Sequence, residues 1–539
     1  MIVLAGLLLS GFQFYVSHTK AAPAHGGSIN IAVIGNPRFI NPVLTQLSDT
    51  DRDLTEIIFS SLMKYDGNGN LVNDAAESYQ IGDGGKIYEI YLKKNIKWQD
   101  GKNLNADDVI FTLQTIQNAD YRSPSRSLWQ GVEIEKIDDY GVRFKLKNPY
   151  APFLQTLTFG IIPKHLWEGV QSSRFALHEL NLKPIGSGPY KFKSYQKDTN
   201  GAITSLELES FDDYFNGRAY ITKIVFKFYA NETEAYSAFK KGEVDVFNFT
   251  SAKTWMDMKD KNNDSLVLNE LTLPHYFAVF FNQSQNKLLA EKNVRQAIAL
   301  GINKKELVQN IFGGYGQAID SPLLPGMLGY TDQIKKYDYS PDEAKNLLAS
   351  DGWKDVDDDG ILEKGKDNQK LQFTLTTIDW PELSQTAQLI QTQLAAIGIK
   401  MEITTKNSTV IQNETIKPRQ YDALLFGEVI GREPDLFHFW HSSQKKESGL
   451  NLSLYENSDV DKLLAGGLED LDINSRGQKL QQVITKISED LPAIFLFSPD
   501  YLFAIKNSIK GVDLKDLDIS STRFSQINNW YLSTTRVWK

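Results

Sequence analysis

A run of alternating strands and helices between residues 371 and 426 constrains the fold of this chain most. The apolar strand LQFTLTTI precedes the helical pattern LSQTAQLIQTQLAAIG, which ends at Gly398, and the strand IKMEITTK follows. A strand, a helix and a second strand in this order form a crossover unit, whose strands lie parallel in one sheet. Another apolar strand follows at residues 421–426. The sequence therefore predicts an α/β fold with a mixed sheet.

The remainder of the chain indicates more than one lobe, because 539 residues exceed the ~100–200 residues of a typical domain. Two hairpins of alternating polarity, KIYEIYLKKNIKWQDGKNL and VEIEKIDDYGVRFKLKN, flank the helical pattern NADDVIFTLQTI. We expect residues 65–183 to form a compact α+β unit, with Asn105 as the N-cap of this helix. The segment PIGSGPYKF, which begins at Pro184, contains two prolines and two glycines and marks a domain boundary.

Charge and cysteine content exclude several classes of function. The net charge is −9 and no basic block is present, so we expect no nucleic-acid partner. The chain has no cysteine, which excludes thiol nucleophiles, disulfides, thiolate metal sites and a lipid-modified cysteine. No HExxH pattern occurs, and the serine of PIGSGPYKF has its glycines immediately adjacent, unlike a GxSxG nucleophile elbow. Signatures of an enzyme are therefore scarce.

The N-terminal residues 1–16, MIVLAGLLLSGFQFYV, are almost wholly apolar. Their length fits the apolar core of an export signal, or a spanning helix a little shorter than the ~20 residues usually required. A buried helix is less favoured, because the segment is uncharged and terminal. We therefore expect residues 1–26 to be an export signal or a membrane anchor with a stalk, and the protein to be extracytoplasmic (periplasmic or at the cell surface) and membrane-anchored.

The stretch YDALLFGEVIGREPDLFHFWHSSQ, residues 421–444, brings charges and aromatic rings together in one loop. We expect its strand to end at Gly427 and its loop to recognise a small molecule, because rigid strands position loops that carry function. The alternative is a solvated charged turn followed by an amphipathic helix. His438 and His441, at i and i+3, also leave metal ligation open. The candidate ligand-binding residues, from this stretch and from other loops and strand ends, are Glu428, Arg432, Glu433, Trp440, Phe281, Asn282, Trp129 and Phe39.

An acidic turn, DVDDDGILE, matches the first part of a calcium loop. Asp355, Asp357 and Asp359 stand at positions one, three and five, a glycine at six and Glu363 at nine. Position twelve, where a glutamate would close the site, is Lys366. Two interpretations remain: an exposed acidic turn, or a site for weakly bound calcium. No other cofactor is expected.

Several blocks in order resemble the extracytoplasmic substrate-binding proteins of ABC transporters in the dipeptide/oligopeptide/nickel family. The blocks are FINPVL, DLTEIIFSSLMKYDGNGNLVNDAAESY, PIGSGPYKF, NVRQAIALGINKKELV and the stretch 421–444. The resemblance implies a two-lobed type II periplasmic-binding-protein fold with an extra α+β domain inserted in the first lobe. Lobe one would comprise residues 27–64, 184–270 and 505–539, the inserted domain residues 65–183, and lobe two residues 271–504.

The same resemblance implies a binding protein rather than an enzyme. It would enclose a ligand, above all a di- or oligopeptide, by closure of the two lobes, and deliver it to the permease subunits of an importer. In peptide-binding relatives an aspartate four residues before the proline grips the peptide's α-amino group, whereas Ile430 stands four residues before Pro434 here. Glu428 and Glu433 are the expected substitutes, and Arg432 is a partner for a carboxylate.

Three alternatives stay open at this stage. Aromatic residues suit an oligosaccharide, the two histidines suit a nickel chelate, and paired carboxylates would also occur in a hydrolase.

Overall fold

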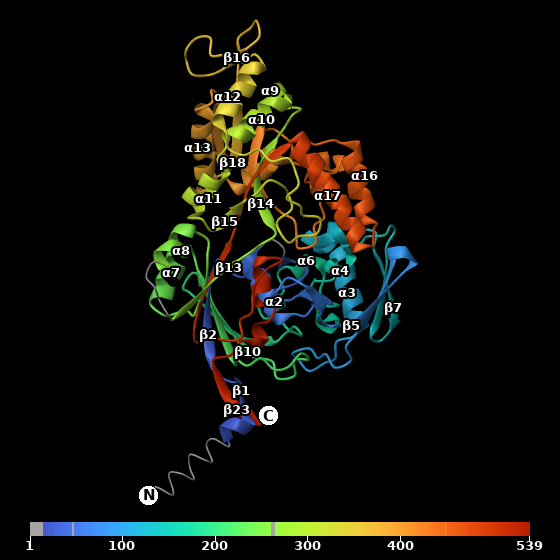
Figure 1. The fold of residues 1–539 in the computed structure, drawn as a ribbon. Helices are drawn as coiled ribbons and strands as arrows, with labels where there is room; N and C mark the ends of the chain where they lie inside the picture. The colour runs from blue at the N-terminus through green and yellow to red at the C-terminus, as the bar shows by residue number, and fades with distance from the viewer. Residues whose placement is uncertain (1–14, 46–47, 260–264, 448, 539) are drawn as a thin grey trace.

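The computed structural model describes residues 15–45, 48–259, 265–447 and 449–538, and the fold has two lobes (Figure 1). The expected signal or anchor, residues 1–16, lies outside the described residues apart from its last two. Among the described residues no helix has both the length and the apolar character needed to cross a bilayer.

Lobe one is built on a seven-stranded sheet in the order β13-β22-β12-β2-β11-β10-β9. The central strand β2 reads SINIAVI, and its neighbours β11 and β12 run parallel to it. Parallel strands of this kind are covered on both faces, which explains the nearly continuous apolar sequence. The elements are β2 (Ser28–Ile34), α2 (Asp49–Ile58), β9 (Tyr190–Lys197), β10 (Ile203–Ser210), β11 (Lys223–Tyr229), α7 (Glu232–Lys240), β12 (Val246–Phe249), α8 (Ala252–Lys259), β13 (Leu266–Leu271) and β22 (Tyr501–Lys506).

The inserted domain packs a four-stranded antiparallel sheet, β5-β6-β8-β7, against helix α3. Asn105 caps α3 as expected: its side chain accepts from the Asp107 N–H, while the Asp108 carboxylate accepts from the Asn105 N–H. One hydrophobic core runs through this domain and lobe one. The elements are β3 (Met63–Tyr65), β4 (Leu71–Asn73), β5 (Ala76–Gly82), β6 (Ile87–Leu92), α3 (Ala106–Gln117), β7 (Glu133–Asp138), β8 (Gly141–Lys145), α4 (Phe153–Thr156), α5 (Lys164–Trp167) and α6 (Ser172–Phe175).

Lobe two has a six-stranded sheet in the order β15-β21-β14-β20-β18-β19. The predicted crossover unit is confirmed, because β18, α13 and β19 follow one another and β18 pairs parallel with both β19 and β20. The main elements are β14 (His275–Phe281), α9 (Lys287–Ala290), α10 (Lys292–Gly301), α11 (Lys304–Phe312), β15 (Gly316–Ala318), α12 (Pro341–Ser350), β18 (Gln372–Ile378), α13 (Pro381–Ala395), β19 (Lys400–Lys406) and β20 (Ala423–Val429). The remaining ones are β16 (Glu363–Lys364), β17 (Gln369–Lys370), α14 (Ser408–Ile411), α15 (Phe437–Trp440), α16 (Ser458–Leu468), α17 (Ile473–Asp490) and β21 (Ala493–Pro499).

The chain crosses between the lobes twice, at residues 272–274 and at residue 500. β21 belongs to the sheet of lobe two, and β22, which begins at Tyr501, belongs to the sheet of lobe one. The expected boundary after residue 504 is therefore corrected to residue 500. Both β21 and β22 are apolar because both are buried in cores. Their sequences therefore do not show where the chain passes from one lobe to the other.

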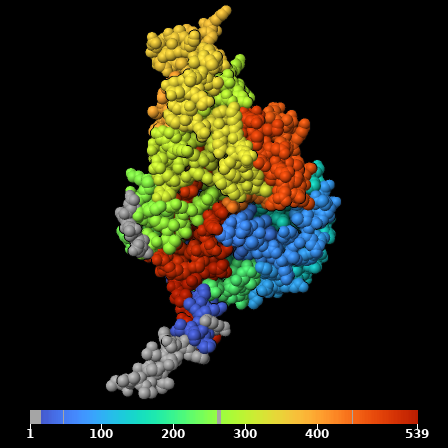
Figure 2. Space-filling model, in the orientation of Figure 1, coloured from blue at the N-terminus to red at the C-terminus, as the bar shows by residue number. Residues whose placement is uncertain are grey.

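Lobe two lies against the inserted domain (Figures 1 and 2). In both views α16 and α17 lie directly over this domain, and the Ala151 N–H donates to the carbonyl of Leu468 at 2.7 Å. The two-stranded ribbon formed by β1 (Thr19–Ala24) and β23 (Ser533–Trp538) projects from the opposite side of lobe one. Lobe two and the inserted domain are therefore in direct contact.

Candidate ligand-binding site

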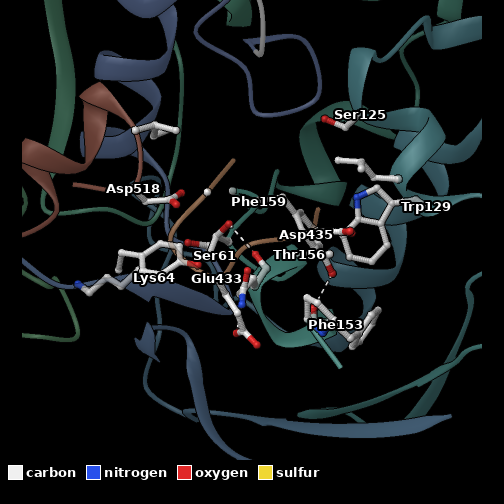
Figure 3. Close-up of a pocket in the computed structure, with 18 of the residues that line it drawn as sticks. Ser61, Lys64, Ser125, Trp129, Phe153, Thr156, Phe159, Glu433, Asp435 and Asp518 are labelled. Atoms are coloured by element: carbon white, nitrogen blue, oxygen red, sulfur yellow. Dashed lines mark hydrogen bonds between the residues drawn. The ribbon is translucent and has the colours of Figure 1, made fainter. Parts of the chain in front are cut away.

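A cavity of about 1110 Å³ lies where lobe one, the inserted domain and lobe two meet. Its lining comes from helix α2, the β3–β4 hairpin, the loops of the inserted domain, the loop after β20 and the segment after β22. In the view of Figure 3, Asp518 and Lys64 lie on one side, Trp129 and Phe153 on the other, and Glu433 and Asp435 between them. Segments far apart in the sequence therefore build one site.

One wall of the cavity is aromatic. Trp129 packs edge-to-face against Phe159 at 5.0 Å and against Phe153 at 6.1 Å between ring centroids. All three rings line the cavity. Trp129 thus lies in the site as expected, although the neighbouring rings leave only 2% of it exposed. This wall suits an apolar part of a ligand.

The loop after β20 also lines the cavity, and it contacts the inserted domain. The Tyr150 O–H donates to Asp435 at 3.0 Å, and Gln155 donates to Glu433, which also forms an ion pair with Arg476 of α17. Glu433 and Asp435 both line the cavity. The loop after β20 therefore contributes acidic residues to the cavity.

Arg432 holds the same loop to lobe one. Its backbone N–H donates to Asp518 at 3.0 Å, and its guanidinium lies 3.4 Å from Asp516. Its side chain is not among those that line the cavity. Gly69 lies against this guanidinium, and a Cβ there would be 2.8 Å from Arg432 Nε. Arg432 therefore acts between the lobes, and its guanidinium already has a carboxylate partner.

The strand β20 continues two residues beyond the expected break at Gly427. Gly427 pairs with Phe277 of β14, and a Cβ on it would lie 2.7 Å from that ring. The glycine therefore makes room for the ring instead of ending the strand, and the turn follows at Gly431, whose φ is +72°. The expected strand end is corrected to Val429.

Four of the expected binding residues lie in the core of lobe two instead of the cavity. Glu428 is buried and accepts from the Tyr276 O–H, and burial raises its pKa to about 8. The Asn282 amide donates to the Arg419 carbonyl at 2.9 Å. The remaining two are Trp440, 1% exposed among aromatic rings, and Phe281, fully buried.

Phe39 is half-buried and is likewise absent from the cavity lining. The expectation that Glu428 takes the place of the missing aspartate is therefore not supported. Among the acidic substitutes only Glu433 lies in the cavity. It is already paired with Arg476.

Helix α2 supplies residues that the sequence reasoning missed. Arg52, Thr55, Glu56 and Phe59 lie on one face of the helix at i, i+3, i+4 and i+7, and all four line the cavity. Burial raises the pKa of Glu56 to about 7. In the sequence, the only signal for these cavity residues was the largely polar face of the helix, and such a face is normally interpreted as solvent-exposed.

Further charged residues line the cavity. Lys64 Nζ of β3 lies 3.3 Å from Asp74, which compensates the charge of the lysine. Asp518, in the segment after β22, has a pKa that burial raises and the Arg432 N–H lowers in part. The cavity thus holds acidic groups from two separate segments of lobe one.

The acidic turn is closed by a lysine. Asp355, Asp357 and Glu363 have oxygens within 4.8 Å of one another, the only such metal-like group among the described residues. Lys370 Nζ lies 3.1 Å from Asp357 and 3.5 Å from Glu363, and it also contacts Asp359. The ammonium supplies the positive charge that a calcium ion would bring.

The two histidines have different neighbours. His441 stacks on Phe437 at 4.1 Å. His438 lines the cavity, with 49% of its side chain exposed, and lies 3.5 Å from Asp435.

Comparisons with known proteins agree with this architecture. The family model for bacterial extracellular solute-binding proteins, family 5 middle, matches residues 70–449. The oligopeptide-binding protein AppA of Bacillus subtilis (strain 168) is 32% identical over 499 residues, which are 91% of this chain and 89% of AppA. The dipeptide-binding protein of Escherichia coli (strain K12) is 25% identical over 94% of this chain and 96% of its own length.

Solved structures show the same fold. AppA from Bacillus subtilis in complex with a nonapeptide has a TM-score of 0.74 at 31% identity, covering 95% of this chain and all of that one. NikZ from Campylobacter jejuni in complex with Ni(L-His) has a TM-score of 0.76 at 25% identity, covering 94% and 99%. The two-lobed type II fold is thus confirmed, and the relatives are binding proteins, which leaves the hydrolase without support. The chain belongs to the bacterial extracellular solute-binding proteins of family 5, which serve ABC transporters.

Proposed function

We propose that this protein binds a peptide between its lobes and delivers it to the permease subunits of an ABC importer. The observation that carries the proposal is the cavity between the lobes. Its volume of about 1110 Å³ exceeds the ~300–1,000 Å³ of typical small-molecule pockets. An aromatic wall, charged groups and residues 429–431 all line this volume. Such a mixture suits a short peptide, which has a polar backbone and varied side chains.

Relatives support the choice of ligand. The Bacillus AppA structure contains a nonapeptide, and the Helicobacter pylori DppA structure contains the peptide STSA. Mass spectrometry of whatever co-purifies with the protein tests the proposal directly. We expect the bound ligands to be peptides, and we expect added peptides to be recovered from the protein with their mass unchanged. A sugar as the released ligand, or cleavage products after incubation with peptides, would contradict it.

A nickel chelate is the second candidate, because His438 lines the cavity and the NikZ structure contains Ni(L-His). Calorimetry with Ni²⁺ and L-histidine discriminates between the two. We expect no saturable heat from the chelate. Saturable binding that His438→Ala abolishes would favour the chelate over a peptide.

We propose further that the N-terminal apolar residues hold the protein at a membrane. The ribbon β1–β23 supports this, because it follows that apolar segment along the chain, and because Tyr15 of the segment and Trp538 of β23 are 40% and 65% exposed. Such aromatic residues favour the membrane–water interface. Fractionation of cells that express the full chain should leave it with the membranes. A freely soluble mature form that starts near Ala24 would contradict the anchor.

A further inference from the structure

Two acidic side chains in the cavity form no ion pair within 4.0 Å with any described residue. Glu56 reaches the cavity from α2, and Asp518 reaches it from the segment after β22. Among the described residues Glu56 has no hydrogen bond or ion pair. Asp518 accepts one hydrogen bond, from the Arg432 N–H to Oδ1, and its Oδ2 has none among the same residues. Glu56 and Asp518 thus present carboxylate oxygens to the cavity from two separate segments of the chain.

The nearby cations are already committed to other carboxylates. Lys64 lies 3.3 Å from Asp74, and the Arg432 guanidinium lies 3.4 Å from Asp516. Arg52, one turn before Glu56, pairs with Asp49. Lys147 is exposed and comes from the inserted domain. The cavity therefore retains negative charge next to α2.

This charge has an energetic cost in the free protein. Burial is the main cause that raises the pKa of Glu56 to about 7, and Asp74, Asp53 and Asp518 raise it further by repulsion, while Lys64 lowers it. A buried carboxylate without a partner is unfavourable, and a cation placed beside it removes most of the penalty. A bound ligand is one source of such a cation.

We propose that the cavity selects ligands with a positively charged nitrogen, which binds between Glu56 and Asp518. This inference rests on the proposed peptide-binding function and narrows it to cationic peptides. The nitrogen belongs to the side chain of a lysine or arginine, because an α-ammonium group is common to all unblocked peptides. This side chain would donate charge-assisted hydrogen bonds to the two carboxylates.

The experiment uses the full chain, freed of ligand, and a synthetic pool of three- to nine-residue peptides. The pool contains each sequence with a free or an acetylated N-terminus, and with lysine or its neutral isostere norleucine. Peptides retained by the protein are identified by mass spectrometry. We expect retained peptides to be enriched at least about 10-fold in the lysine form over the norleucine form, corresponding to a charged hydrogen bond. Comparison of free and acetylated N-termini separates this effect from recognition of the α-ammonium group.

Variants then locate the contact. Glu56→Gln and Asp518→Asn should each weaken binding of the best cationic peptide about 10- to 100-fold, and change binding of its neutral counterpart less than about 3-fold. Glu343→Gln, an equal charge change at an exposed site on α12, is the matched control and should alter neither. Circular dichroism and thermal unfolding verify that the variants fold.

Two outcomes overturn the inference and differ from each other. Retention of peptides without regard to charge, or equal effects of Glu56→Gln and Glu343→Gln, refutes cation selection while peptide binding stands. Retention of no peptide at all refutes the proposed function, and with it this inference.

Discussion

Glu56 should destabilise the ligand-free protein in a pH-dependent way, and Glu56→Gln should remove this cost. The pKa of Glu56 is about 7 in the folded protein, against 4.5 for an unperturbed glutamate. Below pH 4.5 the side chain is protonated in the folded and unfolded states, so it costs nothing. As the pH rises from 4.5 to 7, the unfolded chain loses its proton first, and the folded state is progressively disfavoured.

The size of the effect follows from the shift of the pKa. At ~1.4 kcal/mol per pKa unit, the difference between 4.5 and about 7 corresponds to about 3 kcal/mol above pH 7. Glu56 remains partly open to the cavity, so solvent screens part of this cost and about 3 kcal/mol is an upper value. At pH 5 the same calculation gives roughly 1 kcal/mol or less. Glutamine has nearly the same shape and helix propensity, so the variant isolates the charge.

Thermal and urea unfolding of the ligand-free protein at pH 5 and pH 8 test this reasoning. We expect Glu56→Gln to stabilise the protein at pH 8 and to have little effect at pH 5. The exposed control Glu343→Gln should show no such pH dependence. If Glu56→Gln were equally neutral at both pH values, or destabilising at pH 8, the argument from an uncompensated carboxylate would be refuted.

Three further substitutions test other contacts. Tyr150→Phe removes the hydrogen bond to Asp435 that joins the inserted domain to lobe two. This substitution should weaken ligand binding by about 1 kcal/mol, as measured by calorimetry. An unchanged affinity would show that the hydrogen bond does not support closure of the lobes. Asp53→Asn leaves Arg523 buried without its carboxylate and should lower the free energy of unfolding by about 3–5 kcal/mol, whereas a loss below 1 kcal/mol would mean that the pair is dispensable. We also propose that Lys370 competes with calcium at the acidic turn. In calorimetry, Lys370→Gln should then release or absorb a larger heat on addition of calcium than the unsubstituted protein. Equal heats would reject this competition.

Several parts of the fold followed from local sequence patterns. The crossover of β18, α13 and β19 was predicted because strand and helix periodicities differ and a right-handed crossover places the strands parallel. Asn105 was predicted as a helix cap because its side chain bonds to backbone groups only two or three residues away. The division into two lobes with an inserted unit rested on chain length, on the prolines and glycines near residue 184 and on ordered blocks that resemble a known family. Each of these features depends on neighbouring residues or on the order of segments.

The composition of the site was decided by tertiary structure. Glu428 and Glu433 looked equivalent in the sequence, yet the pairing of β20 with β14 places Glu428 opposite Tyr276 in the core, while the turn beyond Gly431 brings Glu433 to the cavity. Glu56 looked like an exposed helix residue, and Asp518 lies in a segment that follows the last crossing between the lobes. These two carboxylates are more than 400 residues apart in the sequence and meet only because β22 returns the chain to lobe one. A pattern of residues determines which elements form, whereas the pairing and packing of distant elements determine which side chains face the same cavity.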